Sequence, residues 1–177
     1  MKLVILDRDG VINYDSDSYI KSPEEWRPIP GSLEAIARLN HAGFLVVLAT
    51  NQSGVGRGMF EVSTLNAIHD RMHRALAQIG GRIDAIFFCP HAHDANCNCR
   101  TPRSGLLEEI ARRFSVDLKG VPSIGDALRD LQASAAVGAA PILVLTGKGQ
   151  KTLDEGNLPE GTQIHADLAT AARAIMR

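Results

Sequence analysis

Two aspartates follow the first apolar run of the chain, and their spacing suits the binding of a divalent cation. Asp7 and Asp9 lie two residues apart, directly after the run at residues 3–6 (LVIL), and Gly10 follows them. Mg²⁺ prefers oxygen ligands, and proteins usually hold it through one or two carboxylates together with water and phosphate oxygens. A carboxylate in such a place can also serve as a nucleophile. The alternative is a polar turn at the end of a strand, because Asp and Gly favour turns.

Two further polar groups follow later apolar runs. The run at residues 44–49 is followed by hydroxyl, amide and glycine residues: Thr50, Asn51, Gln52, Ser53 and Gly54. Donors of this kind can hold phosphate oxygens, and an ordinary glycine-rich loop is the alternative. The run at residues 122–125 is followed by Asp126, with Asp130 four residues later. Asp126 could complete a metal site or could cap the next helix.

The three cysteines of the chain lie within eleven residues, which indicates a metal site rather than disulfides. Cys89, Cys97 and Cys99 are accompanied by His91, in the pattern C-x-H followed by C-x-C. Three thiolates and one imidazole make a closed tetrahedral set for Zn²⁺. Because a closed set leaves no position for a substrate, we expect a structural role. Spacing alone leaves His93 as an alternative to His91, and free thiols as an alternative to a metal site.

Short apolar runs alternate with helical periods along the whole chain. The sequence predicts strands at 3–6, 44–49, 85–88, 122–125 and 142–145, helices at 32–42, 63–79, 105–114 and 128–137, and a helix or strand–helix unit at 163–176. Strands separated by helices pair in parallel, which predicts a three-layer, Rossmann-like α/β sandwich with a mostly parallel sheet. At roughly 100–200 residues per domain, the chain of 177 residues forms one domain, 1–177, without a large cap. The polar groups after the strands then meet at one edge of the sheet.

The helix predicted at residues 63–79 has the clearest period. We expect its apolar stripe to pack in the core, and the stripe consists of Leu65, Ile68, Met72, Leu76 and Ile79. Three histidines on predicted helices are interpreted as surface or boundary residues without a function: His41, His69 and His73.

Composition and charge exclude several kinds of partner. A net charge of −1 gives no long-range attraction to nucleic acid or to an anionic membrane. No apolar run approaches the roughly 20 residues that span a bilayer, and the first run is too short for a signal peptide. We therefore expect a cytoplasmic protein that binds a small molecule and neither nucleic acid nor membrane. Without an added cap domain, we expect a monomer.

Three strings resemble the haloacid-dehalogenase superfamily of phosphatases. They are D-x-D-G-V-I-N from Asp7 to Asn13, Thr50 at the end of the second strand, and G-D-x-x-x-D from Gly125 to Asp130. The strings DRDGVIN and ATNQSGVGRG and the cysteine cluster are similar to one subgroup of sugar-phosphate and histidinol phosphatases. The resemblance covers nearly the whole chain, and the pattern of this subgroup favours His91 over His93 as the fourth zinc ligand.

The resemblance implies a Mg²⁺-dependent phosphomonoesterase that works through an aspartyl-phosphate. In such an enzyme Asp7 is the nucleophile, Asp9 is the general acid and base, and Thr50 holds phosphoryl oxygens. Mg²⁺ would be held by Asp7, the backbone carbonyl of Asp9, and Asp126. The residues implied in substrate binding are Asp15 and Ser18 in a flap after the first strand, Asn51, Gln52 and Ser53 after the second, and Arg100 and Thr101 beside the cysteines.

One position departs from the pattern of the subgroup. Relatives read C-R-K-P-x-P-G where this chain reads C-R-T-P-R-S-G, so Thr101 replaces a lysine that pairs with the nucleophile and the phosphate. A threonine cannot supply positive charge. Arg100, Arg103 and Lys148 are the candidates that could supply it instead. If none does, catalysis slows, because losing one such electrostatic partner costs on the order of 100–1000-fold in rate.

The stretch DSDSYIKSPEEWRPIPGSLEAIARL resembles most closely the members that act on a heptose. The implied activity is removal of the 7-phosphate of D-glycero-D-manno-heptose 1,7-bisphosphate, for a lipopolysaccharide precursor. Histidinol phosphate is an alternative substrate. A zinc-stabilised phosphosugar-binding protein, its catalysis weakened or lost with the change to Thr101, is the alternative from another class. The retention of Asp7, Asp9 and Asp126 argues against it.

Overall fold

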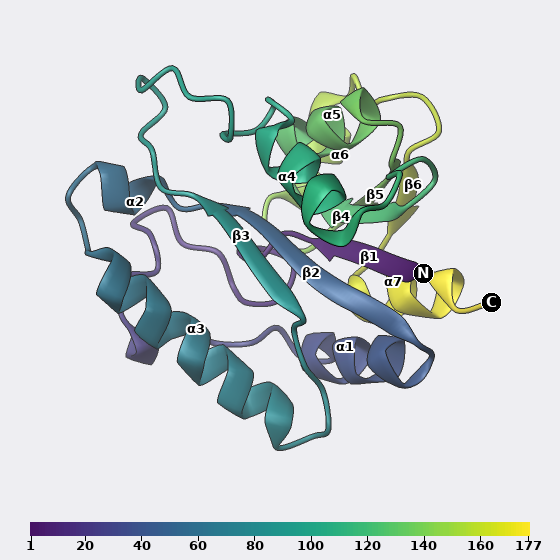
Figure 1. Ribbon diagram of the computed structural model, residues 1–177, viewed down its shortest axis with the longest axis horizontal. Helices are drawn as coiled ribbons and strands as arrows, with labels where there is room; N and C mark the ends of the chain where they lie inside the picture. Colours follow the sequence, from purple (N-terminus) through teal and green to yellow (C-terminus); the bar gives the residue numbers. More distant parts are fainter.

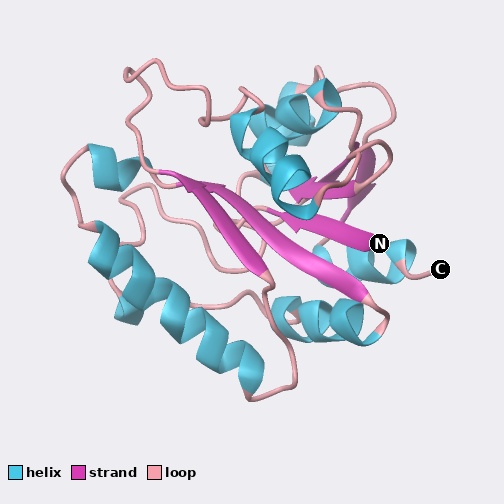
Figure 2. Cartoon of the chain, viewed as in Figure 1, coloured by secondary structure: helices cyan, strands magenta, loops and turns pink.

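Six parallel strands form one sheet in the order β3-β2-β1-β4-β5-β6 (Figures 1 and 2). The structure is a computed structural model that describes residues 1–177. The strands are β1 (Lys2–Leu6), β2 (Phe44–Asn51), β3 (Ala85–Cys89), β4 (Pro122–Gly125), β5 (Ala140–Val144) and β6 (Gln163–His165). Because β1 pairs with β2 on one side and β4 on the other, the residues that follow these three strands lie side by side.

Helices cover both faces of this sheet, which confirms the predicted three-layer α/β sandwich (Figure 1). One face carries α1 (Ser32–His41), α3 (Val62–Ala77) and α7 (Leu168–Ile175). The other carries α4 (Gly105–Phe114) and α5 (Leu128–Ala136). Three short helices lie in the connections: η1 (Pro23–Glu25), α2 (Ser53–Gly56) and α6 (Gly149–Glu155).

The side chains of β1 show why this strand is apolar from Leu3 to Leu6. Val4 and Leu6 belong to the core cluster shared with α1, α3 and α7, whereas Leu3 and Ile5 belong to the cluster shared with α4 and α5. Successive side chains of a strand point to opposite faces, so a strand covered on both faces needs apolar residues at every position. The first polar residue of the chain after Lys2 is Asp7, where the strand leaves the sheet.

The structure corrects two features of the predicted helix at 63–79. The helix ends at Ala77, and Ile79 lies beyond it with 41% of its surface exposed. The end follows from the two glycines after it, since Gly80 has a φ of 77° that a helix cannot continue through. The prediction that His69 is a surface or boundary residue is wrong, because His69 is buried. No helix of the structure is both long enough and apolar enough to cross a membrane.

Candidate active site

Three carboxylates meet at the carboxyl edge of the sheet. Asp7 follows β1, Asp126 follows β4, and Asp130 lies in the first turn of α5. One carboxylate oxygen from each lies within 4.8 Å of the others, a spacing that one metal ion can bridge. Gly10 makes this approach possible: its φ is +85°, and a Cβ there would lie 2.0 Å from Asp126 Oδ2. The glycine of D-x-D-G is therefore required both by its backbone conformation and by lack of space.

Burial raises the pKa values of all three carboxyl groups, and repulsion between carboxylates adds to this at Asp7 and Asp126. Burial, and then the neighbouring carboxylates of Asp130, Asp126 and Asp9, raise the pKa of Asp7 well above its usual range. Burial and the charge of Asp130 raise the pKa of Asp126 to about 7, although the backbone N–H of Lys148 lowers it. Burial likewise raises the pKa of Asp130. A divalent cation would relieve this repulsion, so the donor set fits Mg²⁺.

The carboxylate of Asp9 lies outside that group and is held by hydrogen bonds. Its Oδ1 accepts from Arg8 Nε at 2.9 Å and from Asn13 Nδ2 at 2.9 Å, and Arg8 Nη2 lies 2.8 Å from it. Its Oδ2 accepts only from Gln52 Nε2, at 3.2 Å. Oδ1 is thus fully used, and Oδ2 is the oxygen left to exchange a proton with a ligand in the cleft.

Arg8 is in turn held in place by His69, for which no function was predicted from the sequence. Arg8 is completely buried, and its Nη1 lies 3.0 Å from Nε2 of His69 in α3. Burial, followed by the charge of Arg8, lowers the pKa of His69 to about 3, so the ring is neutral. A signal was present in the sequence, since His69 lies four residues after Leu65 and three before Met72, on the buried stripe.

An open cleft of about 250 Å³ lies above the carboxylates and contains most of the predicted site residues. Its lining is almost entirely polar. The predicted residues that line it are Asp7, Asp9, Asp15, Asn51, Gln52, Ser53, Arg100 and Asp126.

Three predicted residues do not line this cleft. Ser18 is exposed, and its flap neighbours Ser16, Asp17 and Tyr19 contribute to the lining instead. Thr50 is buried, and its hydroxyl accepts a hydrogen bond from Gln52 Nε2 at 3.1 Å.

Thr101, the third of these residues, is bound to the loop after β2. Asn51 Nδ2 donates to Thr101 Oγ1 at 2.7 Å, and the backbone N–H of Thr101 donates to Asn51 Oδ1 at 3.3 Å. This closed pair of hydrogen bonds joins the end of β2 to the segment that follows the cysteines. The hydroxyl at this position therefore has a structural partner, and it supplies no charge.

Three cationic side chains line the cleft, and one of them was not predicted. Arg100, Lys148 and Arg129 contribute to the lining, whereas Arg103 does not. Arg129 lies in the first turn of α5, next to Asp130. An arginine at the start of a helix carries no sequence signal that distinguishes a cleft residue from an exposed one, so it was missed.

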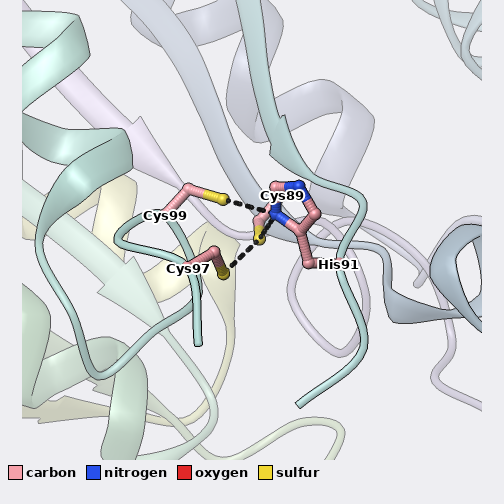
Figure 3. Close-up of side chains that lie close together, drawn as sticks. All are labelled: Cys89, His91, Cys97 and Cys99. Atoms are coloured by element: carbon pink, nitrogen blue, oxygen red, sulfur yellow. Dashed lines mark hydrogen bonds between the residues drawn. The ribbon is translucent and has the colours of Figure 1, made fainter. Parts of the chain in front are cut away.

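The four side chains predicted for zinc lie together beside the cleft (Figure 3). His91 Nδ1 is 3.2 Å from Cys99 Sγ and 3.5 Å from Cys89 Sγ, and the sulfurs of Cys89 and Cys97 are 3.5 Å apart. Tetrahedral Zn²⁺ with bonds of about 2.0–2.3 Å places its ligand atoms roughly 3.5–3.8 Å apart. The cluster could therefore bind zinc with little adjustment.

His93, the alternative ligand, lies elsewhere. Its ring nitrogens contact the guanidinium of Arg57.

The surroundings of Cys97 in the cysteine cluster change its pKa. Burial raises this pKa, but the backbone N–H of Arg100 and the neighbouring thiols and imidazole outweigh burial and lower it to about 6. A thiol that ionises readily favours metal binding, because the thiolate is the ligand.

This parallel sheet, with carboxylates gathered at its carboxyl edge, defines a hydrolase of the haloacid-dehalogenase type. A family described as HAD-hydrolase-like matches residues 98–171. A D-glycero-beta-D-manno-heptose-1,7-bisphosphate 7-phosphatase of Bordetella bronchiseptica is 62% identical over 177 residues, which cover 100% of this chain and 99% of that protein. The enzyme of the same name from Pseudomonas putida is 53% identical, with 99% and 100% covered. The chain belongs to this family of phosphatases.

Solved structures agree with this assignment. The crystal structure of D,D-heptose 1,7-bisphosphate phosphatase from B. bronchiseptica, complexed with magnesium and phosphate, superposes with a TM-score of 0.99, covering 99% of this chain and 98% of that one. The corresponding enzyme from Burkholderia thailandensis is 55% identical, and it superposes with a TM-score of 0.80 and covers 99% of both chains. The predicted family, fold and phosphatase class are confirmed.

Proposed function

We propose that this chain removes the 7-phosphate of D-glycero-β-D-manno-heptose 1,7-bisphosphate. The observation that carries this proposal is the carboxylate cluster of Asp7, Asp126 and Asp130 in a polar cleft, in a chain 62% identical to an enzyme named for that reaction. The β anomer is supported by the names of relatives that are 51–62% identical. The same relationship supports a place in heptose-precursor synthesis for lipopolysaccharide.

The geometry of the carboxylates supports the proposed catalytic roles. Asp7 attacks phosphorus and the sugar oxygen leaves, which forms an aspartyl-phosphate. Asp9 donates the proton to the leaving oxygen through Oδ2, the less occupied oxygen, and then takes a proton from the water that cleaves the intermediate. Asp7, Asp126 and the backbone carbonyl of Asp9 would hold Mg²⁺, which offsets the charge of the carboxylates and the phosphate.

The substrate-binding roles are proposals of the same kind. The cleft residues Asn51, Gln52 and Ser53 offer polar atoms to the phosphoryl group, and Asp15 offers a carboxylate to a sugar hydroxyl. The hydroxyl of Thr50 accepts from Gln52 Nε2 but donates only over a long contact, 3.5 Å to the carbonyl of Asn51, so its proton can turn toward a phosphoryl oxygen. Ser18 acts, in this proposal, only through the conformation of the flap, where its N–H donates to Ser16 Oγ.

Three further proposals concern the whole molecule. Residues 1–177 act as one domain, because a single sheet draws strands from both halves of the chain. The protein works as a monomer, since its exposed large apolar residues lie on several different elements. It works in the cytoplasm, a reducing compartment in which the three cysteines stay available for zinc.

The test is Mg²⁺-dependent release of phosphate from both anomers of heptose 1,7-bisphosphate and from histidinol phosphate. We expect efficient release from the β anomer, slower release from the α anomer, and little from histidinol phosphate. Efficient release from histidinol phosphate alone would replace the proposed substrate. No release from any of them, by a folded chain with zinc bound, would favour the phosphosugar-binding protein.

A further inference from the structure

The cleft has to hold a phosphate dianion beside at least three carboxylates, yet the lysine that relatives of the subgroup use is absent. Thr101 stands at that position, and its hydroxyl is bound to Asn51. A site that stabilises charge on phosphoryl oxygens needs fixed positive groups near them. A group that replaces the lysine must therefore be a nearby cation that is free to bind a phosphate.

Two of the four candidate cations are already engaged. The guanidinium of Arg103 donates to the backbone carbonyl of Cys97 and to Asn96 Oδ1, so it faces the zinc loop. Lys148 Nζ lies 3.3 Å from Asp15 Oδ2, which neutralises its charge at the flap. Neither group is free to bind a phosphate without first breaking a contact.

The other two candidates carry nitrogens that have no partner. Arg129 Nε and Arg100 Nη1 are buried and make no hydrogen bond, although both side chains line the cleft. An unpaired buried donor is costly, and a phosphate oxygen is the strongest acceptor that this cleft would receive. Arg100 follows Cys99 in the zinc loop, whereas Arg129 follows β4 beside the carboxylates.

The position of Arg129 relative to Asp130 places its charge near the reacting group. Arg129 directly precedes Asp130, and a carboxylate oxygen of Asp130 lies within 4.8 Å of one from Asp7 and one from Asp126. The first turn of α5 is also fixed: Asp130 Oδ2 accepts from the backbone N–H of Ala127, and Leu131 is fully buried. The backbone that carries Arg129 is therefore fixed, and a fixed position is what electrostatic stabilisation requires.

We propose that Arg129 is a phosphate-binding residue and supplies the positive charge that Thr101 cannot. The proposal rests on the proposed function, because the phosphate that Arg129 binds is the one that Asp7 attacks. It assigns to an arginine on α5 the work that relatives of the subgroup give to a lysine in the zinc loop. Arg129 then contributes both to the affinity for the phosphoryl group and to the rate.

The experiment compares Arg129→Met, Arg129→Lys and the double variant Arg129→Met with Thr101→Lys. We expect Arg129→Met to lose on the order of 100-fold in kcat/KM and Arg129→Lys to keep most of it. The double variant should regain at least about tenfold over Arg129→Met, because the lysine restores the positive charge that relatives of the subgroup carry at position 101. Arg113→Met, an exposed arginine on α4, is the matched control and should behave as the parent chain.

A second measurement separates this proposal from the proposed function. Binding of inorganic phosphate to the Mg²⁺-loaded chain is measured by calorimetry, so that it needs no substrate turnover. We expect weaker binding in Arg129→Met than in the parent chain and in Arg129→Lys. Unchanged phosphate affinity in a folded Arg129→Met, or loss of affinity in Arg103→Met alone, would overturn the role of Arg129. Failure of the parent chain to hydrolyse the heptose substrate, with these affinities as expected, would overturn only the proposed function.

Discussion

Nε2 of His69 lies 3.0 Å from Nη1 of Arg8, the residue between the two aspartates of the first motif. A guanidinium can only donate, so Nε2 accepts and the ring proton is on Nδ1. Arg8 in turn contacts Asp9 Oδ1 through two nitrogens. A histidine on α3 thus determines where the carboxylate of Asp9 lies, although His69 itself does not line the cleft.

The first prediction concerns this chain of contacts. His69→Leu leaves a buried donor of Arg8 without a partner, which should cost about 1–3 kcal/mol in the free energy of unfolding. Because Asp9 is then held less firmly, kcat should fall by on the order of tenfold. His69→Gln should recover both properties, since its Oε1 can accept from Arg8. Denaturant unfolding and steady-state kinetics check this, with exposed His73→Leu as control; equal kcat in all four proteins would contradict a positioning role.

The second prediction is a pH dependence of stability. The pKa of His69 is about 3 in the folded chain and roughly 6.5 when unfolded, so only the unfolded chain gains this proton between those values. The contribution of His69 is therefore fully present above pH 6.5 and is lost as the pH falls below it. The parent chain should lose up to about 1.4 kcal/mol per pH unit relative to His69→Gln. Unfolding of both proteins between pH 5 and 7.5 measures this difference, and parallel curves would exclude it.

The third prediction concerns Asp7→Asn. Turnover should be abolished, because an amide cannot form the aspartyl-phosphate. The zinc content should be unchanged. The Tm in Mg²⁺-free buffer should be equal or higher, because the substitution removes one of several buried carboxylates that repel one another and raise one another's pKa values. Metal analysis and thermal unfolding accompany the assay. Persistent turnover at the parent rate would remove Asp7 from the role of nucleophile.

The fourth prediction concerns the cysteine cluster. Cys97→Ala should lose zinc and lower the Tm together, because a closed site contributes to folding through its metal. Phosphate release should also fall, since Arg100 directly follows the cluster. Asp94→Ala, exposed in the same loop, serves as control for general damage. One equivalent of zinc in the purified Cys97→Ala protein would show that Cys97 is not a ligand.

The fold was predictable because short, mainly apolar runs alternate with segments of helical period. Strand β4 and helix α4 were predicted at the bounds that the structure has, and the strand ends indicated where Asp7 and Asp126 would meet. The cluster of three cysteines and one histidine was predictable because all three cysteines of the chain lie within eleven residues. These features depend on local pattern and on residue types that have few other uses.

The remaining parts of the site depend on side-chain direction, which spacing does not encode. Arg129 lies in the first turn of a helix, where an arginine is ordinary, and only the folded structure shows that it lines the cleft. Thr101 could be recognised as a departure, but its partner Asn51 is 50 residues earlier. Helix α6 was missed because its seven residues include a glycine and no apolar stripe.

The hydrogen-bonded pair of Thr101 and Asn51 also bears on the order in which substitutions can accumulate. A lysine at position 101 lacks the hydroxyl that accepts a hydrogen bond from Asn51 Nδ2. A change from threonine to lysine would therefore add a positive charge and remove a hydrogen bond that joins two loops. With Arg129 supplying that charge, the exchange brings no benefit. An ancestor that first gained the arginine could lose the lysine without an inactive intermediate, whereas the opposite order passes through one. Positions 101 and 129 are therefore expected to vary together among relatives.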